Sequence, residues 1–252
     1  MVIKMKEYLD ITYDDLGNKL DLYTPDSSNF STLIYIHGGG LVEGDKSQDN
    51  YKEMASSFTK SGYAFASLNY RLYPQVKYPG YILDVIDGIN YLYDHIDEYG
   101  GNKSFIISGQ SAGAYIALMI SVNIEFNQML KFDYDVIKGW IFDSAQTTTH
   151  FRILEKEYGI DPYAERIDKC APIYYLDKNT RLDNALFIVY ENDIIKRKEQ
   201  NILFNETLKY FKNEANVSFL TLKGGHCNGS INKDSDNEYE YVKVVLSWLD
   251  KK

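Results

Sequence analysis

A serine flanked by glycines is the strongest chemical signal in the chain. Ser111 is the central residue of the sequence Gly-Gln-Ser-Ala-Gly at 109–113. An apolar stretch at 105–107 precedes this sequence, and a helical pattern at 115–119 follows it. A serine in a strand, turn and helix of this kind is held in a strained conformation with its hydroxyl exposed, where it can act as a nucleophile. An ordinary glycine-rich turn would not explain the flanking strand and helix, so we interpret Ser111 as a nucleophile.

Three consecutive glycines follow another apolar strand, in the sequence His-Gly-Gly-Gly at 37–40. Glycines leave their backbone N–H groups unobstructed, and such groups can converge on an oxygen that becomes negative during acyl transfer. We therefore predict an oxyanion hole formed by Gly39 and Gly40 together with the amide of Ala112. A flexible loop would explain the glycines but not their combination with Ser111. We expect His37 to shape the loop rather than to act as a base.

These residues need elements that bring them to one place. Stretches rich in β-branched and aromatic residues predict strands at 3–13, 19–23, 32–36, 63–68, 104–108, 137–143, 185–190 and 217–222. Helical periodicity predicts helices at 47–61, 80–99, 112–122, 196–213 and 237–251. This alternation predicts an α/β fold with an eight-stranded, mostly parallel sheet and helices on both faces. The first two strands have no helix between them and predict an antiparallel hairpin at the sheet edge.

One interval, 146–181, breaks the alternation of strands and helices. A gap of this length inside a compact domain is seldom without structure. We predict that it forms a small lid over the site, within a single domain that spans 1–252. Four tyrosines in or beside this interval are expected to border a pocket for an acyl or aromatic group, namely Tyr158, Tyr163, Tyr174 and Tyr175.

The charge of the chain restricts its partners. The 252 residues carry a formal net charge of −9, and the resulting field repels phosphate backbones and anionic lipids. We therefore expect no nucleic-acid partner. The stretch 104–124 contains no charged residue, but the polar residues at its centre favour a buried strand, turn and helix over a membrane span. No membrane partner is expected.

The cysteines, histidines and amino terminus carry further expectations. Two cysteines, Cys170 and Cys227, are too few for a disulfide framework. The charged amino terminus lacks the pattern of a secretory leader, so we predict a cytoplasmic location. The four histidines are scattered without metal-ligand spacing, and we expect neither a metal nor a cofactor.

Five segments in order resemble a known family. They are Leu-Asp-Leu-Tyr-Thr-Pro at 20–25, His-Gly-Gly-Gly at 37–40, Gly-Asp-Lys at 44–46, Asn-Tyr-Arg-Leu at 69–72 and Gly-Gln-Ser-Ala-Gly at 109–113. Together they resemble the carboxylesterase and lipase branch of the α/β-hydrolase fold, related to hormone-sensitive-lipase-like and to feruloyl or acetyl esterase-like enzymes. The resemblance covers nearly the whole chain, and it implies the α/β-hydrolase fold and a serine esterase.

The chain order of this family, serine then acid then histidine, implies two partners for Ser111. Asp193 follows one predicted strand and resembles the family's acid, and His226 follows the next and resembles its base. Both stand just beyond the carboxyl ends of strands, where α/β sheets build their sites. Glu191 and Asp143 are alternative acids.

These roles imply a serine carboxylesterase that hydrolyses small to medium acyl esters through an acyl-enzyme on Ser111. An amidohydrolase of the same fold, such as an arylformamidase or an exopeptidase, would use the same nucleophile and oxyanion hole. A non-catalytic binding protein that keeps the fold is a third hypothesis. We expect a small-molecule ester as the substrate, while the oligomeric state stays open.

Overall fold

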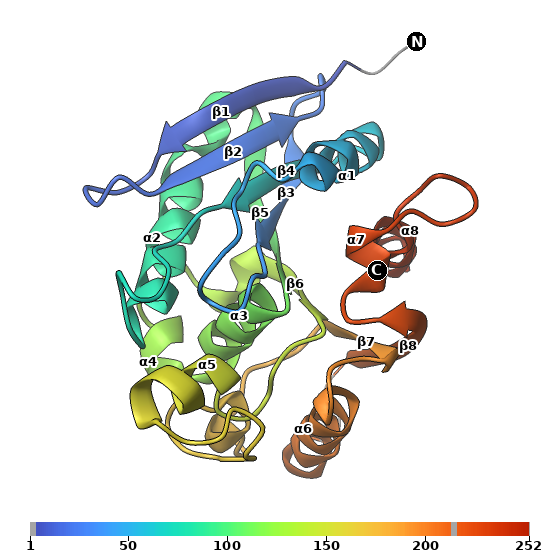
Figure 1. Cartoon of the computed structure of the whole chain (residues 1–252). Helices are drawn as coiled ribbons and strands as arrows, with labels where there is room; N and C mark the ends of the chain where they lie inside the picture. Colours follow the sequence, from blue (N-terminus) through green and yellow to red (C-terminus); the bar gives the residue numbers. More distant parts are fainter. Residues whose placement is uncertain (1–3, 213–215, 252) are drawn as a thin grey trace.

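The centre of the protein is one eight-stranded sheet (Figure 1). The computed structural model describes residues 4–212 and 216–251. The strands are β1 Lys6–Thr12, β2 Lys19–Thr24, β3 Phe30–Ile36, β4 Ala64–Leu68, β5 Gly101–Gln110, β6 Ile137–Asp143, β7 Ala185–Asn192 and β8 Val217–Gly225. Their spatial order is β1-β2-β4-β3-β5-β6-β7-β8. The strand β2 is antiparallel to both of its neighbours, and all other pairs are parallel. The predicted mostly parallel sheet with an antiparallel hairpin at its edge is confirmed.

Helices cover both faces of the sheet. Their bounds are α1 Asp49–Lys60, α2 Gly80–His95, α3 Ala112–Val122, α6 Arg197–Phe211 and α8 Glu240–Leu249. One buried cluster contains residues of α2, α3 and α6, and the other contains residues of α1 and α8. Along β3, Leu33 and Tyr35 belong to the cluster with α1 and α8, whereas Ile34 and Ile36 belong to the other. Side chains of a strand alternate in this way when both faces of the sheet are covered.

Six of the seven shortest helices in the described chain are absent from the sequence prediction, whereas Ile96–Tyr99 falls within the predicted helix 80–99 as a 3-10 continuation of α2. The seven are α4 Ile124–Asn127, α5 Phe151–Ile153, α7 Asn228–Ile231, the 3-10 helices η1 Ile96–Tyr99, η2 Tyr134–Val136 and η4 Pro172–Tyr175, and the π-helix η3 Leu154–Tyr158. One turn of helix is too short to show a hydrophobic period. Strand β5 starts before its predicted bound because Gly101 pairs with Phe30 of β3. The predicted strand start at 3 and helix end at 213 lie outside the described residues.

The uncharged stretch 104–124 forms most of β5, the turn at Ser111, α3 and the start of α4. All residues of α3 are buried between the sheet and its neighbours. Within the part of the chain that the structure describes, no helix is long and apolar enough to cross a bilayer. The absence of charge in this stretch therefore reflects burial inside the fold.

Tyrosines fill much of the core beneath α1 and α8. Tyr35 of β3 is fully buried, and its ring meets those of Tyr51 and Tyr241 edge-on at 5.0 and 5.8 Å. The hydroxyl of Tyr241 bonds with the Ser108 hydroxyl at 2.6 Å. Among the described residues, no donor or acceptor reaches the hydroxyl of Tyr35. Two tyrosines in one cluster thus differ in whether their polar atom is satisfied.

We predict that removing these two hydroxyls has opposite effects on stability. Tyr35→Phe removes a buried group that has no partner, so the free energy of unfolding is unchanged or rises by about 1 kcal/mol. Tyr241→Phe leaves the Ser108 hydroxyl without its partner and lowers the free energy of unfolding by about 1 to 2 kcal/mol. Urea unfolding of both variants measures the difference. Equal losses in the two variants would contradict the assignment.

Candidate active site

The turn that carries Ser111 is strained and tightly packed. Ser111 has φ 51° and ψ −109°, a conformation that side-chain-bearing residues rarely adopt. Its N–H donates to the backbone oxygen of Asp143 on the neighbouring strand at 2.7 Å. A Cβ on Gly113 would lie 2.0 Å from the backbone oxygen of Ile36, so only glycine lets α3 approach β3 so closely. These contacts hold the Ser111 side chain at the carboxyl end of the sheet.

A chain of hydrogen bonds joins the three residues that the family resemblance brought together. The hydroxyl Oγ of Ser111 lies 2.8 Å from Nε2 of His226. On the other side of the ring, Nδ1 of His226 lies 2.5 Å from Oδ1 of Asp193. Ser111 stands between β5 and α3, Asp193 directly follows β7, and His226 directly follows β8. The structure therefore brings a hydroxyl, an imidazole and a carboxylate from three strand ends into one hydrogen-bonded chain, an arrangement able to support acyl transfer.

Asp193 is held as a carboxylate by several donors. Its Oδ2 accepts a hydrogen bond from the hydroxyl of Ser144 at 2.8 Å, and its Oδ1 accepts one from the N–H of Ile194 at 2.7 Å. Burial by itself would raise the pKa of Asp193, but the hydrogen bond and charge of His226, with the bonds from Ser144 and Ile194, hold that pKa below its ordinary value. An ionised Asp193 fixes the orientation of the imidazole and offsets its charge when it takes up a proton.

The glycine loop after β3 faces Ser111. Gly39 and Gly40, with φ 102° and 61°, line a cavity of about 260 Å³ that also contains Ser111 and His226. Ala112 is the first residue of α3, where backbone N–H groups have no acceptor within the helix. Gly39 and Gly40 thus line the same cavity as Ser111, and Ala112 adjoins Ser111 in the chain.

His37 belongs to the architecture of this loop. Its ring is buried and stacks on Tyr70 at 4.4 Å, and its Nδ1–H donates to the backbone oxygen of Gly38 at 2.7 Å. Burial lowers the pKa of His37 to about 4. A neutral imidazole with its proton on Nδ1 shapes the loop, in agreement with the role expected from the sequence.

A second cavity adjoins the first. It has a volume of about 370 Å³ and shares Phe151 and Ile194 with the Ser111 cavity. Its other walls include Tyr163 and the aliphatic side chain of Ile195. Phe151 comes from the interval 146–181, so part of this interval borders the site. The two cavities together offer room for an ester beyond its reacting carbon.

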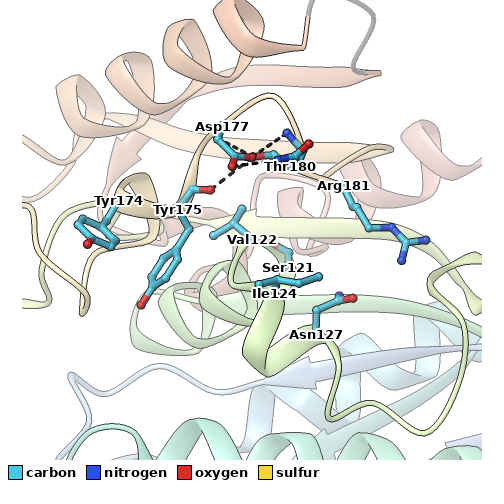
Figure 2. Close-up of a pocket in the computed structure, with 10 residues that line it drawn as sticks. Ser121, Val122, Ile124, Asn127, Tyr174, Tyr175, Asp177, Thr180 and Arg181 are labelled. Atoms are coloured by element: carbon cyan, nitrogen blue, oxygen red, sulfur yellow. Dashed lines mark hydrogen bonds between the residues drawn. The ribbon is translucent and has the colours of Figure 1, made fainter.

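The tyrosine prediction for this interval holds only in part. Figure 2 shows a third cavity, of about 390 Å³, that is lined by Tyr174 and Tyr175 together with Ser121 and Val122. Ser121 and Val122 end α3, whereas Ser111 precedes its first residue. Eleven helical residues span roughly 16 Å. Tyr174 and Tyr175 therefore border a pocket away from Ser111, and Tyr163 is the tyrosine of this group that lines the cavity next to the site.

Neither alternative acid contacts His226 in the described structure. Glu191 is exposed near the end of β7. Asp143 is fully buried at the end of β6, where its Oδ2 accepts a hydrogen bond from the hydroxyl of Ser230 at 2.7 Å. Burial raises the pKa of Asp143 to about 7, although the bond from Ser230 opposes this change. Of the three carboxylates considered from the sequence, the geometry brings Asp193 to the histidine.

The sequence analysis missed two polar contacts of the site. Ser144 donates to Asp193, and Arg152 donates from Nε to the backbone oxygen of Gly40 at 3.3 Å. Ser144 directly follows β6, so the rule that parallel strands end at one edge could have identified it. No sequence signal marks Arg152, because its contact depends on how the interval 146–181 folds back over the glycine loop.

The ligand sets that metal ions require consist of several side chains that lie close together. Within residues 4–212 and 216–251, the structure contains no group of three or more histidine, cysteine, aspartate or glutamate side chains able to hold an ion. Cys170 and Cys227 are both buried free thiols.

We predict that Asp143 makes stability fall with rising pH. An unfolded aspartate ionises near pH 4, whereas folded Asp143 stays protonated to about pH 7. The folded state binds more protons between these values, so up to roughly 4 kcal/mol of stability is lost as the pH rises from 4 to 7. Asp143→Asn cannot ionise and avoids this loss.

Urea unfolding of wild type and Asp143→Asn at pH 4.5, 6 and 8 measures the effect. The difference in unfolding free energy between variant and wild type is expected to grow in favour of the variant as the pH rises. Asp135→Asn removes an exposed carboxyl as the matched control, and its difference from wild type should stay nearly constant. Parallel stability curves for Asp143→Asn and wild type would rule out the raised pKa.

Comparison with known protein families and curated proteins places the chain among α/β-hydrolases. The BD-FAE family model matches residues 20–160, which is more than half of the chain. A kynurenine formamidase from Debaryomyces hansenii is 31% identical over 145 residues, covering 56% of this chain and 47% of the formamidase. An acetyl esterase from Salmonella paratyphi B is 34% identical over 108 residues, covering 42% of this chain and 32% of the esterase. The matched segments thus span about half, or less, of these relatives.

Solved structures agree on the fold over a longer stretch. Esterase B from Lactobacillus rhamnosis has a TM-score of 0.76 to this chain, covering 98% of it and 85% of the esterase at 17% identity. A similarity of this extent shows that the chain has the α/β-hydrolase fold, as its sequence motifs implied. The family match includes the serine turn and the glycine loop but ends before Asp193 and His226.

Proposed function

This chain belongs to the BD-FAE family, and we propose that it is a serine esterase with Ser111, His226 and Asp193 as its catalytic triad. The observation that carries this proposal is the unbroken hydrogen-bond chain from Ser111 through His226 to Asp193, at 2.8 and 2.5 Å, beside a cavity. The acetyl esterase relative supports an ester as the substrate.

The mechanism follows from the protons that these atoms can move. Nε2 of His226 accepts the proton of the Ser111 hydroxyl as its oxygen attacks the ester carbonyl. The imidazolium then gives this proton to the leaving alcohol, and an acyl-enzyme on Ser111 remains. A water molecule loses a proton to His226 and attacks the acyl group, which releases the acid and regenerates Ser111. Asp193 stays ionised throughout and stabilises the charged ring.

Backbone amides supply the electrostatic part of the mechanism. The carbonyl oxygen becomes negative in each tetrahedral intermediate, and we assign its binding to the N–H groups of Gly39, Gly40 and Ala112. Such donors stabilise the transition state without reorganisation, and losing one typically lowers turnover about 10²- to 10³-fold. The positive φ values of Gly39 and Gly40 support this role, since they turn the loop toward the cavity.

The cavities suggest esters with small to medium acyl groups. The space at Ser111 and the adjoining space along Phe151 have volumes of about 260 and 370 Å³. We assign the interval 146–181 to a lid that borders both cavities, within a single domain of 1–252. The apolar side chains of Phe151, Ile194 and Ile195 suit the hydrocarbon part of such a substrate.

An amidohydrolase activity is the second candidate. The kynurenine formamidase relative supports it, because the same nucleophile and oxyanion donors cleave an amide bond. The leaving group decides between the two activities. A panel of p-nitrophenyl esters, an acetylated sugar and a formylated aromatic amine separates them by kcat/KM, and a formamide cleaved faster than every ester would favour the amidohydrolase.

We predict that Ser111→Ala abolishes hydrolysis of p-nitrophenyl acetate and butyrate and prevents labelling by a fluorophosphonate probe. The hydroxyl that forms the acyl-enzyme is absent in this variant, whereas the fold is kept. Ser121→Ala is the matched control, since it removes a buried serine hydroxyl at the other end of α3. It should retain both turnover and labelling. Equal turnover by wild type and Ser111→Ala, or none by either, would refute the proposed esterase.

We predict that Phe151→Ala shifts the preference toward longer acyl chains. Phe151 lines both cavities, so its loss joins them into one larger space. The ratio of kcat/KM for p-nitrophenyl hexanoate over acetate is expected to rise about ten-fold. One or two methylene groups that fit the enlarged cavity better would stabilise the transition state by about this amount. Tyr174→Ala, in the cavity of Figure 2, serves as the control and should leave the ratio unchanged. A ratio unaffected by Phe151→Ala would contradict the assignment of the second cavity.

A further inference from the structure

Behind the proposed triad lies a buried arginine that the mechanism does not use. Arg197 is the first residue of α6, four positions after Asp193, and only 2% of its surface is exposed. Other cationic side chains of the structure lie within ion-pair distance of a carboxylate. Among the described residues, by contrast, no carboxylate lies within that distance of the Arg197 guanidinium. A buried charge without a direct partner is costly in free energy. Its retention in the fold calls for a compensating interaction.

The guanidinium holds the loop that supports Asp193. Its Nη1 donates to the backbone oxygen of Ser144 at 2.7 Å, and its Nη2 donates to Oε1 of Gln146 at 3.3 Å. The hydroxyl of Ser144 in turn donates to Oδ2 of Asp193 at 2.8 Å. Ser144 has φ 56°, so this loop needs support to hold its conformation. Arg197 therefore contacts the backbone of the residue whose side chain orients the acid.

The charge of Arg197 also acts on Asp193 through space. Burial lowers the pKa of Arg197, while the negative charge of Asp193 is the largest influence that raises it. An arginine nevertheless stays protonated in proteins. In a buried region of low dielectric constant, a cation near Asp193 favours the carboxylate.

We propose that Arg197 is a positioning residue for the acid Asp193, which it orients through Ser144 and keeps ionised by its positive charge. This inference rests on the proposed function, since it assigns a role within the same triad. It also explains how a buried guanidinium is tolerated, because the carboxylate of Asp193 offsets its charge.

Other charged and titratable groups lie near Arg197 and Asp193, and their charges must be considered beside that of Arg197. Asp143 at the end of β6 and Cys227 after His226 are both fully buried. Glu165, from the interval 146–181, accepts hydrogen bonds from Gln200 at 3.1 Å and lies 3.8 Å from Nζ of Lys196. Burial raises the pKa values of Asp143 and Cys227, so both stay largely protonated at acidic pH. Arg197 is then the buried group whose fixed positive charge acts on the triad.

Three variants separate the charge from the hydrogen bonds. Arg197→Met removes both, Arg197→Lys keeps the charge but loses the two-pronged contact, and Ser144→Ala cuts the link to Asp193 without changing Arg197. Arg181→Met is the control, because it removes an arginine that stacks on Tyr134 next to the cavity of Figure 2. For each, kcat and KM for p-nitrophenyl butyrate are measured from pH 5 to 9. The kcat is expressed per site labelled by a fluorophosphonate, so that unfolded molecules are not counted.

We expect the acidic limb of the kcat/KM profile to move up by roughly one pH unit in Arg197→Met, because the His226–Asp193 pair binds a proton more tightly without the cation. The limb should stay in place in Arg197→Lys and Arg181→Met. We expect kcat to fall about 10- to 100-fold in Arg197→Met and about ten-fold in Arg197→Lys and Ser144→Ala, with KM unchanged, since the acid is misplaced while the substrate site is intact.

Several outcomes would overturn the proposal. A merely structural role predicts a lower melting temperature with kcat per labelled site and the pH profile unchanged. A direct contact with substrate, which the position of Arg197 beside the second cavity makes testable, predicts a raised KM with kcat unchanged. If Arg197→Met does not fold, then wild-type kcat in both Arg197→Lys and Ser144→Ala refutes the link through Ser144. If the wild type shows turnover that depends on Ser111, any of these three outcomes refutes the role of Arg197 but not the proposed esterase. If the wild type shows no turnover that depends on Ser111, the proposed function is refuted as well.

Discussion

The strained backbone conformation of Ser111, with its positive φ, is the constraint on which the rest of the site depends. This conformation depends on the close packing of α3 against the backbone of β3, which leaves no room for a side chain at position 113 and therefore requires Gly113. The parallel strands β3, β5, β6, β7 and β8 then all end at the edge where this turn lies. Each strand end contributes one part of the site, so the local strain at one serine is balanced by the packing of the whole sheet.

Sequence patterns were sufficient for the fold, for Ser111 and for the glycine loop. Long apolar strands and amphipathic helices have a period that a single sequence displays, and Ser111 and Gly39 stand next to such elements. Asp193 and His226 became candidates only through the family's chain order, because an isolated aspartate or histidine after a strand has no distinctive spacing. Arg152 could not be found, since its contact with Gly40 depends on a long interval without a hydrophobic period. The same reason explains why Tyr174 was expected near the site and lies elsewhere.

Two buried ionisable groups of opposite type lie near the site and are stabilised differently. Among the described residues no cation forms an ion pair with Asp143, and its carboxyl avoids the cost of burial by taking up a proton. Arg197 cannot lose its proton, so it depends on hydrogen bonds to carbonyl oxygens and on the carboxylate of Asp193. Near the end of β6, burial thus favours the protonated form of Asp143, whereas Asp193 is ionised and interacts with the charged Arg197.

The contact between Arg152 and the backbone oxygen of Gly40 connects two parts of the site that otherwise have separate tasks. Phe151, the neighbouring residue, lines both cavities, while Gly40 belongs to the glycine loop that lines the cavity at Ser111. In the proposed esterase, a substrate that presses against Phe151 would also act on the loop assigned to oxyanion binding. On this proposal, selection among acyl groups would be expressed in the rate of the chemical step as well as in binding, so that a poorly fitting ester is bound but hydrolysed slowly.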